Sequence, residues 1–253
     1  MWFIPLCTFW ALLIVAIRRA SYRQSLRDKP QGDWLLDLSG LGVQGWVIPL
    51  LEIAIVYEGW KLVMPTLEGQ WQLHPVTTFA LQFIGVDYLY YWNHRALHSS
   101  RLWSLHRVHH SLTQMDIWGT ARNTLWSSFF IVYLWVNGTL FFFVSEKGSF
   151  LIAAALTAAL DLWRHSSAGV QRPRWLPASL SAVFVMPEDH AKHHSSNLSM
   201  SNFGANFSLW DRLHGTWAPP HVAPKEMGIP CHLSVLRQLL WPFAHQKDVI
   251  KEK

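Results

Sequence analysis

Cysteine and charged residues are both scarce in this chain of 253 residues. The two cysteines, Cys7 and Cys231, lie far apart and form no C-x-x-C pair, so neither a disulfide framework nor a zinc ribbon is expected. Charged residues make up 15% of the chain and hydrophobic residues 51%, whereas soluble domains carry roughly 25% charged residues. Sixteen tryptophans add to this bias, because tryptophan favours the membrane–water interface. The composition indicates a membrane protein.

Several cofactor motifs are also missing from the sequence. It contains no C-x-x-C-H haem site, no Gly-rich nucleotide fingerprint and no cysteine set for an iron–sulfur cluster. The net charge of +5 does not indicate nucleic-acid binding, because the basic residues flank apolar segments and are typical of a positive cytoplasmic face.

Apolar segments account for much of the first 160 residues. The first is followed, not preceded, by positive charge, which predicts a membrane anchor with its N-terminus outside and not a signal peptide. We predict an all-α, multi-pass membrane protein with about four to five transmembrane helices and a cytoplasmic, histidine-rich di-metal cap. The expected spans are residues 2–17, 41–64, 76–92 and 123–145, with a shorter returning arm at 149–160.

The distribution of basic residues tests this topology. If the spans alternate, 19 of the 21 lysines and arginines fall on the inner side, because only Lys61 and Lys147 lie at or near the outer loops. We read residues 1–253 as a single membrane domain. Its expected parts are an N-terminal transmembrane anchor region at 1–75, a catalytic region at 76–217 and a cytoplasmic or interfacial tail at 218–253.

Three histidine clusters fall on the same predicted inner face. Residues at i, i+3 and i+4 share one side of a helix, so each cluster can direct several imidazoles to one place. A tetrahedral zinc site takes three or four ligands, and nine imidazoles better suit two metals with open positions. Imidazole alone does not select the metal. The candidate ligands are His94 and His98 in "HRALH", His106, His109 and His110 in "HRVHH", His190, His193 and His194 in "HAKHH", and the isolated His165.

Other polar residues allow more than one interpretation. Asp87 and Glu52 lie inside apolar segments, where ionisable groups are costly and are functional candidates. Asp87 lies two turns before His94, too far to bond to it, so it either orients a ligand from a neighbouring helix or forms a structural ion pair. The isolated histidines are expected to be structural: His74, His214, His221, His232 and His245.

Four motifs together resemble the fatty acid hydroxylase superfamily, also called the sterol desaturase family. They are "DYLYYWNHRALH", "LWSLHRVHHS", "HAKHHSSN" and "NFGANFSLWDRLHGTW", between about Asp87 and Trp217. The resemblance implies a non-haem di-iron oxidase that uses O2 and external electrons to hydroxylate a C–H bond of a fatty acyl, sterol or related lipid. It implies all nine candidate histidines as ligands. Asp161 stands where some members have a further histidine, so it is either a carboxylate ligand or a group that orients one.

The resemblance also implies partners and a location. The expected partners are a membrane lipid and a cytochrome b5-like or ferredoxin/reductase electron donor, with no nucleic acid. The expected membrane is a bacterial inner membrane or the endoplasmic reticulum, with the site on the cytoplasmic face. The lipid is expected to enter through an aromatic slot, although an interfacial belt explains the same four tryptophans equally well: Trp92, Trp103, Trp118 and Trp126.

Three alternatives remain at this point. A desaturase of the same family shares the initial hydrogen abstraction. A metal-dependent hydrolase would need a glutamate in an H-E-x-x-H motif, and "HRALH" and "HRVHH" have arginine there. A metal transporter would place its ions near the membrane midplane and often shows internal repeats, and none is visible. Hydroxylation is the leading hypothesis.

Overall fold

The computed structural model describes residues 3–167, 178–197, 200–219 and 226–243. Within these residues the chain is helical and contains no named β-strand, only three isolated bridges between single residues. The predicted all-α class is therefore confirmed for the described part of the chain. His221 and His245, both expected to be structural, lie outside it.

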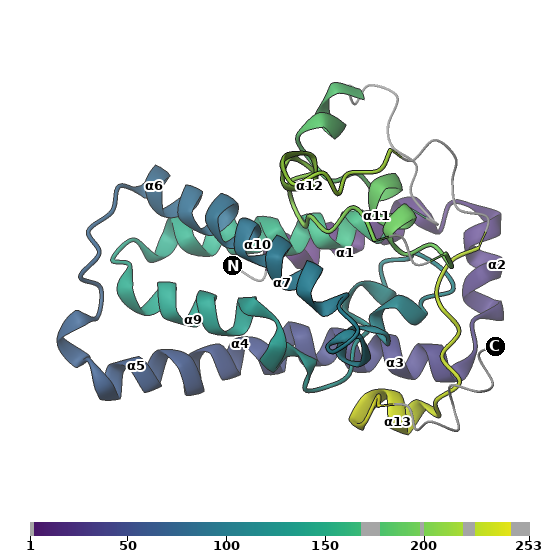
Figure 1. Cartoon of the computed structure of the whole chain (residues 1–253), viewed down its shortest axis with the longest axis horizontal. Helices are drawn as coiled ribbons and strands as arrows, with labels where there is room; N and C mark the ends of the chain where they lie inside the picture. The colour runs from purple at the N-terminus through teal and green to yellow at the C-terminus, as the bar shows by residue number, and fades with distance from the viewer. Residues whose placement is uncertain (1–2, 168–177, 198–199, 220–225, 244–253) are drawn as a thin grey trace.

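One long helix runs along an edge of the molecule (Figure 1). It covers 33 residues from Gln31 to Val63. Pro49 lies within it, in the first turn of α4 after a π-helical stretch, where a residue that cannot donate an N–H is tolerated. Its successive parts are α3 (Gln31–Gly42), η1 (Val43–Val47), α4 (Ile48–Leu51), η2 (Glu52–Tyr57) and α5 (Glu58–Val63).

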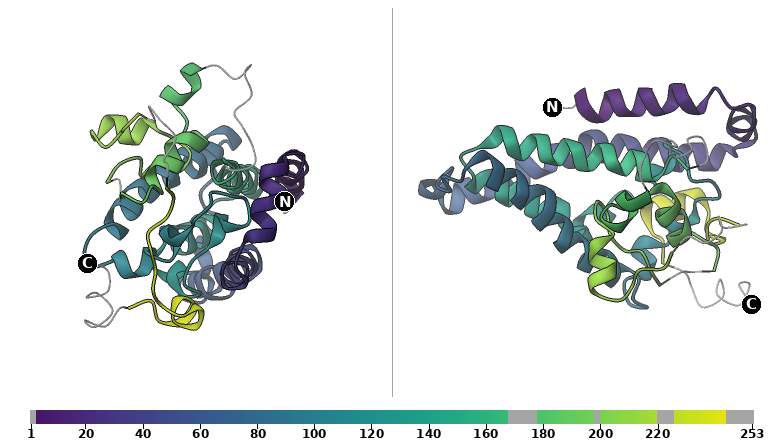
Figure 2. Two further views of the ribbon diagram at one scale, coloured as in Figure 1. Left: turned by 90° about the vertical axis from the view of Figure 1, so that its right-hand side faces the viewer. Right: turned by 90° about the horizontal axis from the view of Figure 1, so that it is seen from above.

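Two shorter helices precede the long one. α1 (Phe3–Ala16) and α2 (Ala20–Asp28) meet at 107°. α1 packs against α10 (Lys147–Arg164), and the view from above shows the two lying side by side (Figure 2). α1 therefore lies back along the helical bundle.

Two further pieces of the chain complete the bundle, a continuous helical run and a helical hairpin. α6 (Pro75–Ala80), η4 (Leu81–Gly85) and α7 (Val86–Leu97) follow one another directly, and α9 (Val132–Phe143) and α10 form a hairpin beside them. Side chains of α7, α9, α10 and the residue that follows α9 form one apolar cluster, whose buried members are Val86, Leu140, Val144 and Phe150. His74 caps the start of α6, because its Nδ1 accepts the amide N–H of Val76 at 3.3 Å, so its expected structural role is confirmed.

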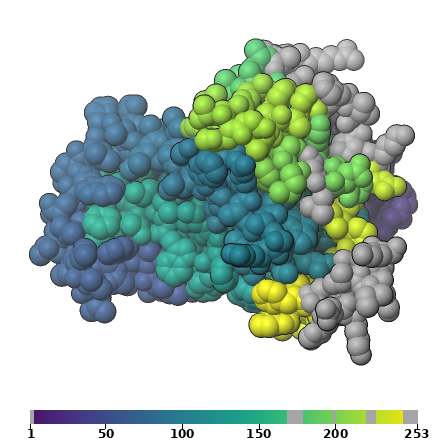
Figure 3. All heavy atoms as spheres, viewed as in Figure 1, coloured from purple at the N-terminus to yellow at the C-terminus, as the bar shows by residue number. Residues whose placement is uncertain are grey.

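The remaining elements are short. The C-terminal ones gather at the end of the molecule away from α5 and α6 (Figure 3). This is the end at which α7 and α10 finish. The short elements are η3 (Pro65–Leu67), α8 (Trp103–His106), η5 (His109–Ser111), η6 (Gly119–Ala121), η7 (Ser127–Phe130), η8 (Ala178–Ala182), α11 (Pro187–His193), α12 (Leu209–Leu213) and α13 (Val235–Leu240).

The predicted spans agree with the structure only in part. Among the described residues, one helix, Gln31–Val63, is long and apolar enough to cross a membrane, or two if the bent pair α1 and α2 is a single broken span. The helix predicted at 123–145 begins only at Val132, because the preceding residues turn to bond elsewhere, as when Thr124 Oγ1 donates to the Gln238 carbonyl at 2.9 Å. The number of spans and their orientation stay predictions.

Candidate metal centre

All nine candidate histidines are buried, and the structure brings them together in two groups. In each group, one nitrogen from every ring lies within 4.8 Å of one from each other ring. The five-histidine group consists of His94, His98, His106, His110 and His193. The four-histidine group consists of His109, His165, His190 and His194.

Each H-x-x-H-H cluster contributes to both groups. His106 and His110 point into the five-histidine group, whereas His109 points into the four-histidine group. Neighbouring residues on a helix point about 100° apart, so an adjacent pair of histidines can serve two centres. The third cluster divides in the same way, with His193 in one group and His194 in the other.

Backbone carbonyls fix the rings in the five-histidine group. His94 Nδ1 lies 2.8 Å from the carbonyl oxygen of Phe203, and His193 Nδ1 lies 2.7 Å from that of Ser201. A carbonyl only accepts, so both Nδ1 atoms carry the proton and both Nε2 atoms present a lone pair. Those two Nε2 atoms are 3.1 Å apart. Two lone pairs at that distance repel each other, and a cation between them would turn the repulsion into attraction.

The four-histidine group has the same construction. His109 Nδ1 donates to the Arg122 carbonyl at 3.2 Å, and His165 Nδ1 donates to the Asp161 carbonyl at 2.9 Å. The Nε2 atoms of His165 and His190 then approach to 3.1 Å. Two rings in each group are thus held with a free Nε2 directed at their neighbours.

Many of the remaining ring nitrogens have no hydrogen-bond partner within the described part of the chain. An unpaired buried polar group costs about 1–3 kcal/mol, so a cluster of them is unfavourable unless a ligand satisfies it. Imidazole nitrogens suit iron, zinc, copper and nickel, and the donor set therefore fits a metal in each group. The unpaired nitrogens are both atoms of His98, His110 and His194, and Nδ1 of His106 and His190.

Burial lowers the pKa of eight of the nine rings and keeps those rings neutral. Burial, reinforced by His165, lowers the pKa of His109 to about 3. Burial also lowers the pKa of His193 to about 4, against the hydrogen bond to Ser201. Metal ligation requires a deprotonated imidazole nitrogen, so the groups are prepared for a cation at neutral pH.

Asp87 does not contact the histidine groups. Its carboxylate accepts the backbone N–H of Asn206 at 2.7 Å and of Phe207 at 3.2 Å, and the indole N–H of Trp210 at 2.8 Å. These contacts are neither a bond to a ligand histidine nor an ion pair. They hold the segment 206–210 against α7.

Asp161 belongs to neither group but touches a member of one. Its Oδ1 lies 2.6 Å from Arg164 Nη2 and 3.4 Å from His165 Nδ1. Arg164 in turn donates to the Ala205 carbonyl at 2.6 Å. Of the two possibilities drawn from the sequence, the structure favours a group that orients His165.

The other singled-out residues lie away from the two groups, with one exception. His214 Nε2 lies 3.2 Å from the hydroxyl of Tyr88, so it is not among the converging histidines, as predicted. Of the four tryptophans proposed for a slot, Trp103 alone contacts the groups, with its ring 5.3 Å from those of His98 and His110. Trp118 packs instead on Phe9 and Trp34. The four do not form one slot.

Sequence reasoning missed the loop that orients the five-histidine group. Ser201 and Phe203 supply both carbonyls, and Asn202 between them has a left-handed backbone with φ of 58°. Asp211 holds this loop, because its carboxylate accepts the N–H groups of Phe203 at 2.8 Å and Gly204 at 2.7 Å. The sequence "SNFG" does signal a tight turn. Nothing in it signals that two carbonyls face histidines.

Comparison with known proteins identifies the family. The sequence model described as fatty acid hydroxylase matches residues 79–216, which include all nine histidines. The chain is 28% identical to an ornithine lipid hydroxylase, OlsE, of Rhizobium tropici over 68% of this chain and 53% of that protein. It is 24% identical to an alkylglycerol monooxygenase of Xenopus tropicalis over 65% of this chain and 34% of that protein. No solved structure matches.

The chain spans about a third to a half of the length of these curated relatives. The family match nevertheless covers more than half of the chain and contains both histidine groups. The chain therefore belongs to the fatty acid hydroxylase family.

Proposed function

We propose that this protein is a membrane-bound lipid hydroxylase whose two histidine groups each hold an iron ion. The observation that carries the proposal is the pair of groups itself, with buried imidazoles converging in a segment that matches the family. Neutral ligands leave the metal charge uncompensated. Two ferrous ions would supply the electrons and the site for O2 activation that an unactivated C–H bond requires.

The chain's own residues bind, orient and exclude water. Phe203 packs its ring on His94, His98 and His193, and Trp103 covers His98 and His110 from another side. All nine histidines are at most 6% exposed, which keeps bulk water from the reacting atoms. Both features favour controlled oxidation over hydrolysis.

The surface of the long helix supports a lipid environment. Trp46, Leu50 and Ile53 are 70%, 65% and 51% exposed, respectively, and a contiguous exposed apolar surface is typical of a membrane or partner contact. We propose that this helix lies in the bilayer and that the substrate enters from the lipid phase. The named relatives act on an ornithine lipid and on alkylglycerols, so we propose a lipid carrying an acyl or alkyl chain as the substrate.

We propose that the electrons come from outside this sequence, which carries no C-x-x-C-H haem motif, Gly-rich nucleotide fingerprint or iron–sulfur cysteine set. We propose a cytochrome b5-like or ferredoxin/reductase donor and a site on the cytoplasmic face. A donor of this type would approach from the same side as the short C-terminal elements, away from the apolar surface of the long helix.

The deciding experiment is a lipid mass spectrum recorded under heavy-oxygen gas. Wild type and a His193→Ala/His194→Ala variant, which removes one histidine from each group, would be expressed in the same host with a reductase supplied. We expect one lipid to gain a single heavy oxygen atom with the wild type alone. That lipid would also identify the substrate.

Two other outcomes would change the proposal. A lipid that loses two hydrogens without gaining oxygen would mean a desaturase on the same histidine groups. Identical lipid spectra for the wild type and the variant, with iron bound to the wild type, would overturn the oxidase proposal.

A further inference from the structure

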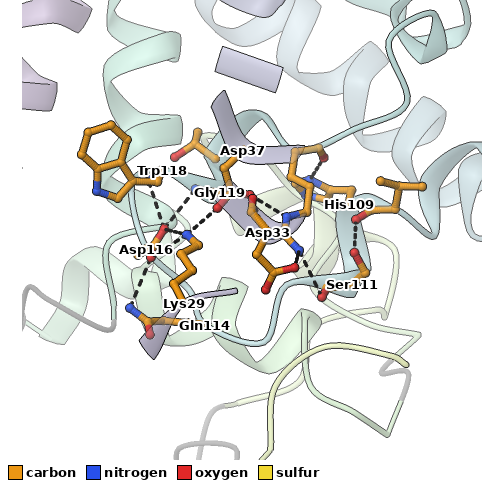
Figure 4. Close-up of polar contacts among 12 residues, drawn as sticks. Lys29, Asp33, Asp37, His109, Ser111, Gln114, Asp116, Trp118 and Gly119 are labelled. Carbon is orange, nitrogen blue, oxygen red and sulfur yellow. Dashed lines mark hydrogen bonds and ion pairs between the residues drawn. The ribbon is translucent and has the colours of Figure 1, made fainter. Parts of the chain in front are cut away.

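Arg122 is buried close to the four-histidine group although it carries a full positive charge. Its side chain is 1% exposed. Its Nε donates to Asp37 Oδ1 at 2.6 Å, and its Nη1 lies 3.2 Å from Asp33 Oδ1. Both acids belong to α3, and Figure 4 shows them near His109. The side chain of Arg122 is thus fixed from the N-terminal part of the long helix.

The backbone of the same residue orients a candidate ligand. The carbonyl oxygen of Arg122 accepts the Nδ1–H of His109 at 3.2 Å. This bond fixes the tautomer and the ring plane, and it leaves His109 Nε2 to face the four-histidine group. One residue therefore connects a carboxylate of α3 to an imidazole of the centre, through its side chain on one side and its carbonyl on the other.

The same carboxylate is part of a wider anchor. Lys29 pairs with Asp37 and also with Asp116, whose Oδ2 lies 3.1 Å from the lysine Nζ. Asp116 Oδ1 in turn accepts the backbone N–H groups of Trp118 and Gly119, each at 3.0 Å. The segment 116–122 is therefore held at both of its ends (Figure 4).

Stability alone is a weak reason for such a network. Buried ion pairs roughly break even against apolar residues of the same size, because burial strips the charges of water. They do define one geometry, since each charge must meet its partner. A defined geometry is what a ring that binds a metal requires.

We propose that Asp37 and Arg122 form a positioning pair for His109, so that the four-histidine group depends on a carboxylate of α3. This inference rests on the proposed function, because it takes the group to be a metal site. Asp37 lies outside residues 79–216, the segment that matches the family. The long helix would therefore act on the metal centre as well as in the membrane.

The test is an anaerobic titration of the full-length, detergent-solubilised chain with ferrous iron against a competing chelator. Asp37→Leu keeps the approximate size of the side chain but removes the acceptor of the Arg122 Nε–H. It should lower the affinity for one of the two bound ions by about 10- to 100-fold. Asp37→Asn keeps an oxygen that accepts the Arg122 Nε–H, and it should restore most of the affinity. Asp28→Asn is the control, because Asp28 is exposed and bonds only to Gln24 among the described residues.

Ligand-deficient backgrounds identify the weakened site. In His98→Ala, where the five-histidine group is damaged, Asp37→Leu should weaken the binding of the ion that remains in the four-histidine group. In His190→Ala, where the four-histidine group is damaged, it should change the remaining ion little. A general loss of stability would affect both backgrounds alike. If Asp37→Leu does not fold, Asp33→Ala removes the partly exposed contact of Arg122 and should cause a smaller loss at the same site.

The outcomes separate the two proposals. Two ions bound with equal affinity to the wild type and Asp37→Leu, or equal weakening in both backgrounds, would overturn the positioning pair and leave the proposed function standing. A wild type that binds no iron would overturn the proposed function and this inference with it.

Discussion

The rings of His110 and His194 stack on each other although they belong to different groups. Their centroids are 4.3 Å apart and their planes are inclined by 15°. The backbones of both residues are held by one segment, because Ile229 N–H donates to the His110 carbonyl at 2.7 Å and Gly228 N–H donates to the His194 carbonyl at 2.9 Å. The stacked pair therefore lies where the two groups meet, with one ring from each group.

Removing either ring of this stacked pair should weaken metal binding in one group more than in the other. We expect His110→Ala to weaken iron binding at the five-histidine group and His194→Ala at the four-histidine group. Partners of ligands alone are typically worth 10- to 100-fold in affinity or activity, so turnover should fall by at least about 100-fold in each variant. Iron content and lipid turnover, measured on the same preparations, check this prediction. His214→Ala, which alters a histidine outside both groups, should keep both ions.

Gly228 should be intolerant of a side chain. Its φ is +75°, and a Cβ placed there would lie 2.2 Å from the Leu112 carbonyl oxygen. We expect Gly228→Ala to lower the free energy of unfolding by about 2–4 kcal/mol, from backbone strain and overpacking together. Thermal unfolding in detergent measures it. Gly215 shares the positive φ, at +68°, but has open space around it, so Gly215→Ala should cost only about 1 kcal/mol. Equal losses would contradict this account.

Asp211 should matter to the five-histidine group without touching it. Its carboxylate accepts the N–H groups of Phe203 and Gly204 and the hydroxyl of Thr216, the last at 2.7 Å. Asp211→Ala leaves buried donors unpaired and should cost about 2–4 kcal/mol of stability. Because the Phe203 carbonyl orients His94, the affinity of the five-histidine group for iron should fall as well. Retention of full iron affinity in a destabilised Asp211→Ala would show that the loop does not set the ring.

The iron-free chain should lose stability in mild acid. The pKa of His109 is about 3 and that of His193 about 4 in the folded chain, because of burial, against an ordinary value of 6.5. Below pH 6.5 the unfolded chain therefore binds protons that the folded chain does not, and folding becomes less favourable as the pH falls. As the pH falls below 6.5, each ring should lower the free energy of unfolding by about 1.4 kcal/mol per pH unit, until the pH reaches the pKa of that ring in the folded chain. Melting temperatures between about pH 7.5 and 5 check the slope. An iron-free chain that is equally stable throughout that range would contradict the buried, neutral state.

The sequence was enough to predict which nine histidines come together, but not how they divide into a group of five and a group of four. Helical spacing brings His94 and His98 to one side, and this follows from local geometry alone. The assignment of His109 and His110 to different groups depends on a turn from α8 into a 3₁₀ segment and on packing against α11, which are tertiary features.

The role of Asp87 was unpredictable for a similar reason. Its distance from His94 followed from the helical rise, but its partners are backbone groups of residues 206 and 207, more than a hundred residues later. The same holds for Arg122, whose carbonyl orients His109. Backbone carbonyls leave no residue-type signal, so the orientation of the rings could be seen only in the folded chain.

The length of the long helix bears on how far the histidines would lie from a bilayer. Its 33 residues extend about 50 Å at 1.5 Å per residue, whereas the hydrocarbon core of a bilayer is about 30 Å thick. If this helix crosses a bilayer along its normal, about 20 Å of it would project beyond the hydrocarbon. Asp37, near the start of this helix, is joined through Arg122 to the four-histidine group, so in that arrangement the helix would set the distance from the bilayer to the histidines. The carbon atom that is oxidised would then be chosen by how far along its chain a lipid reaches from its own resting depth.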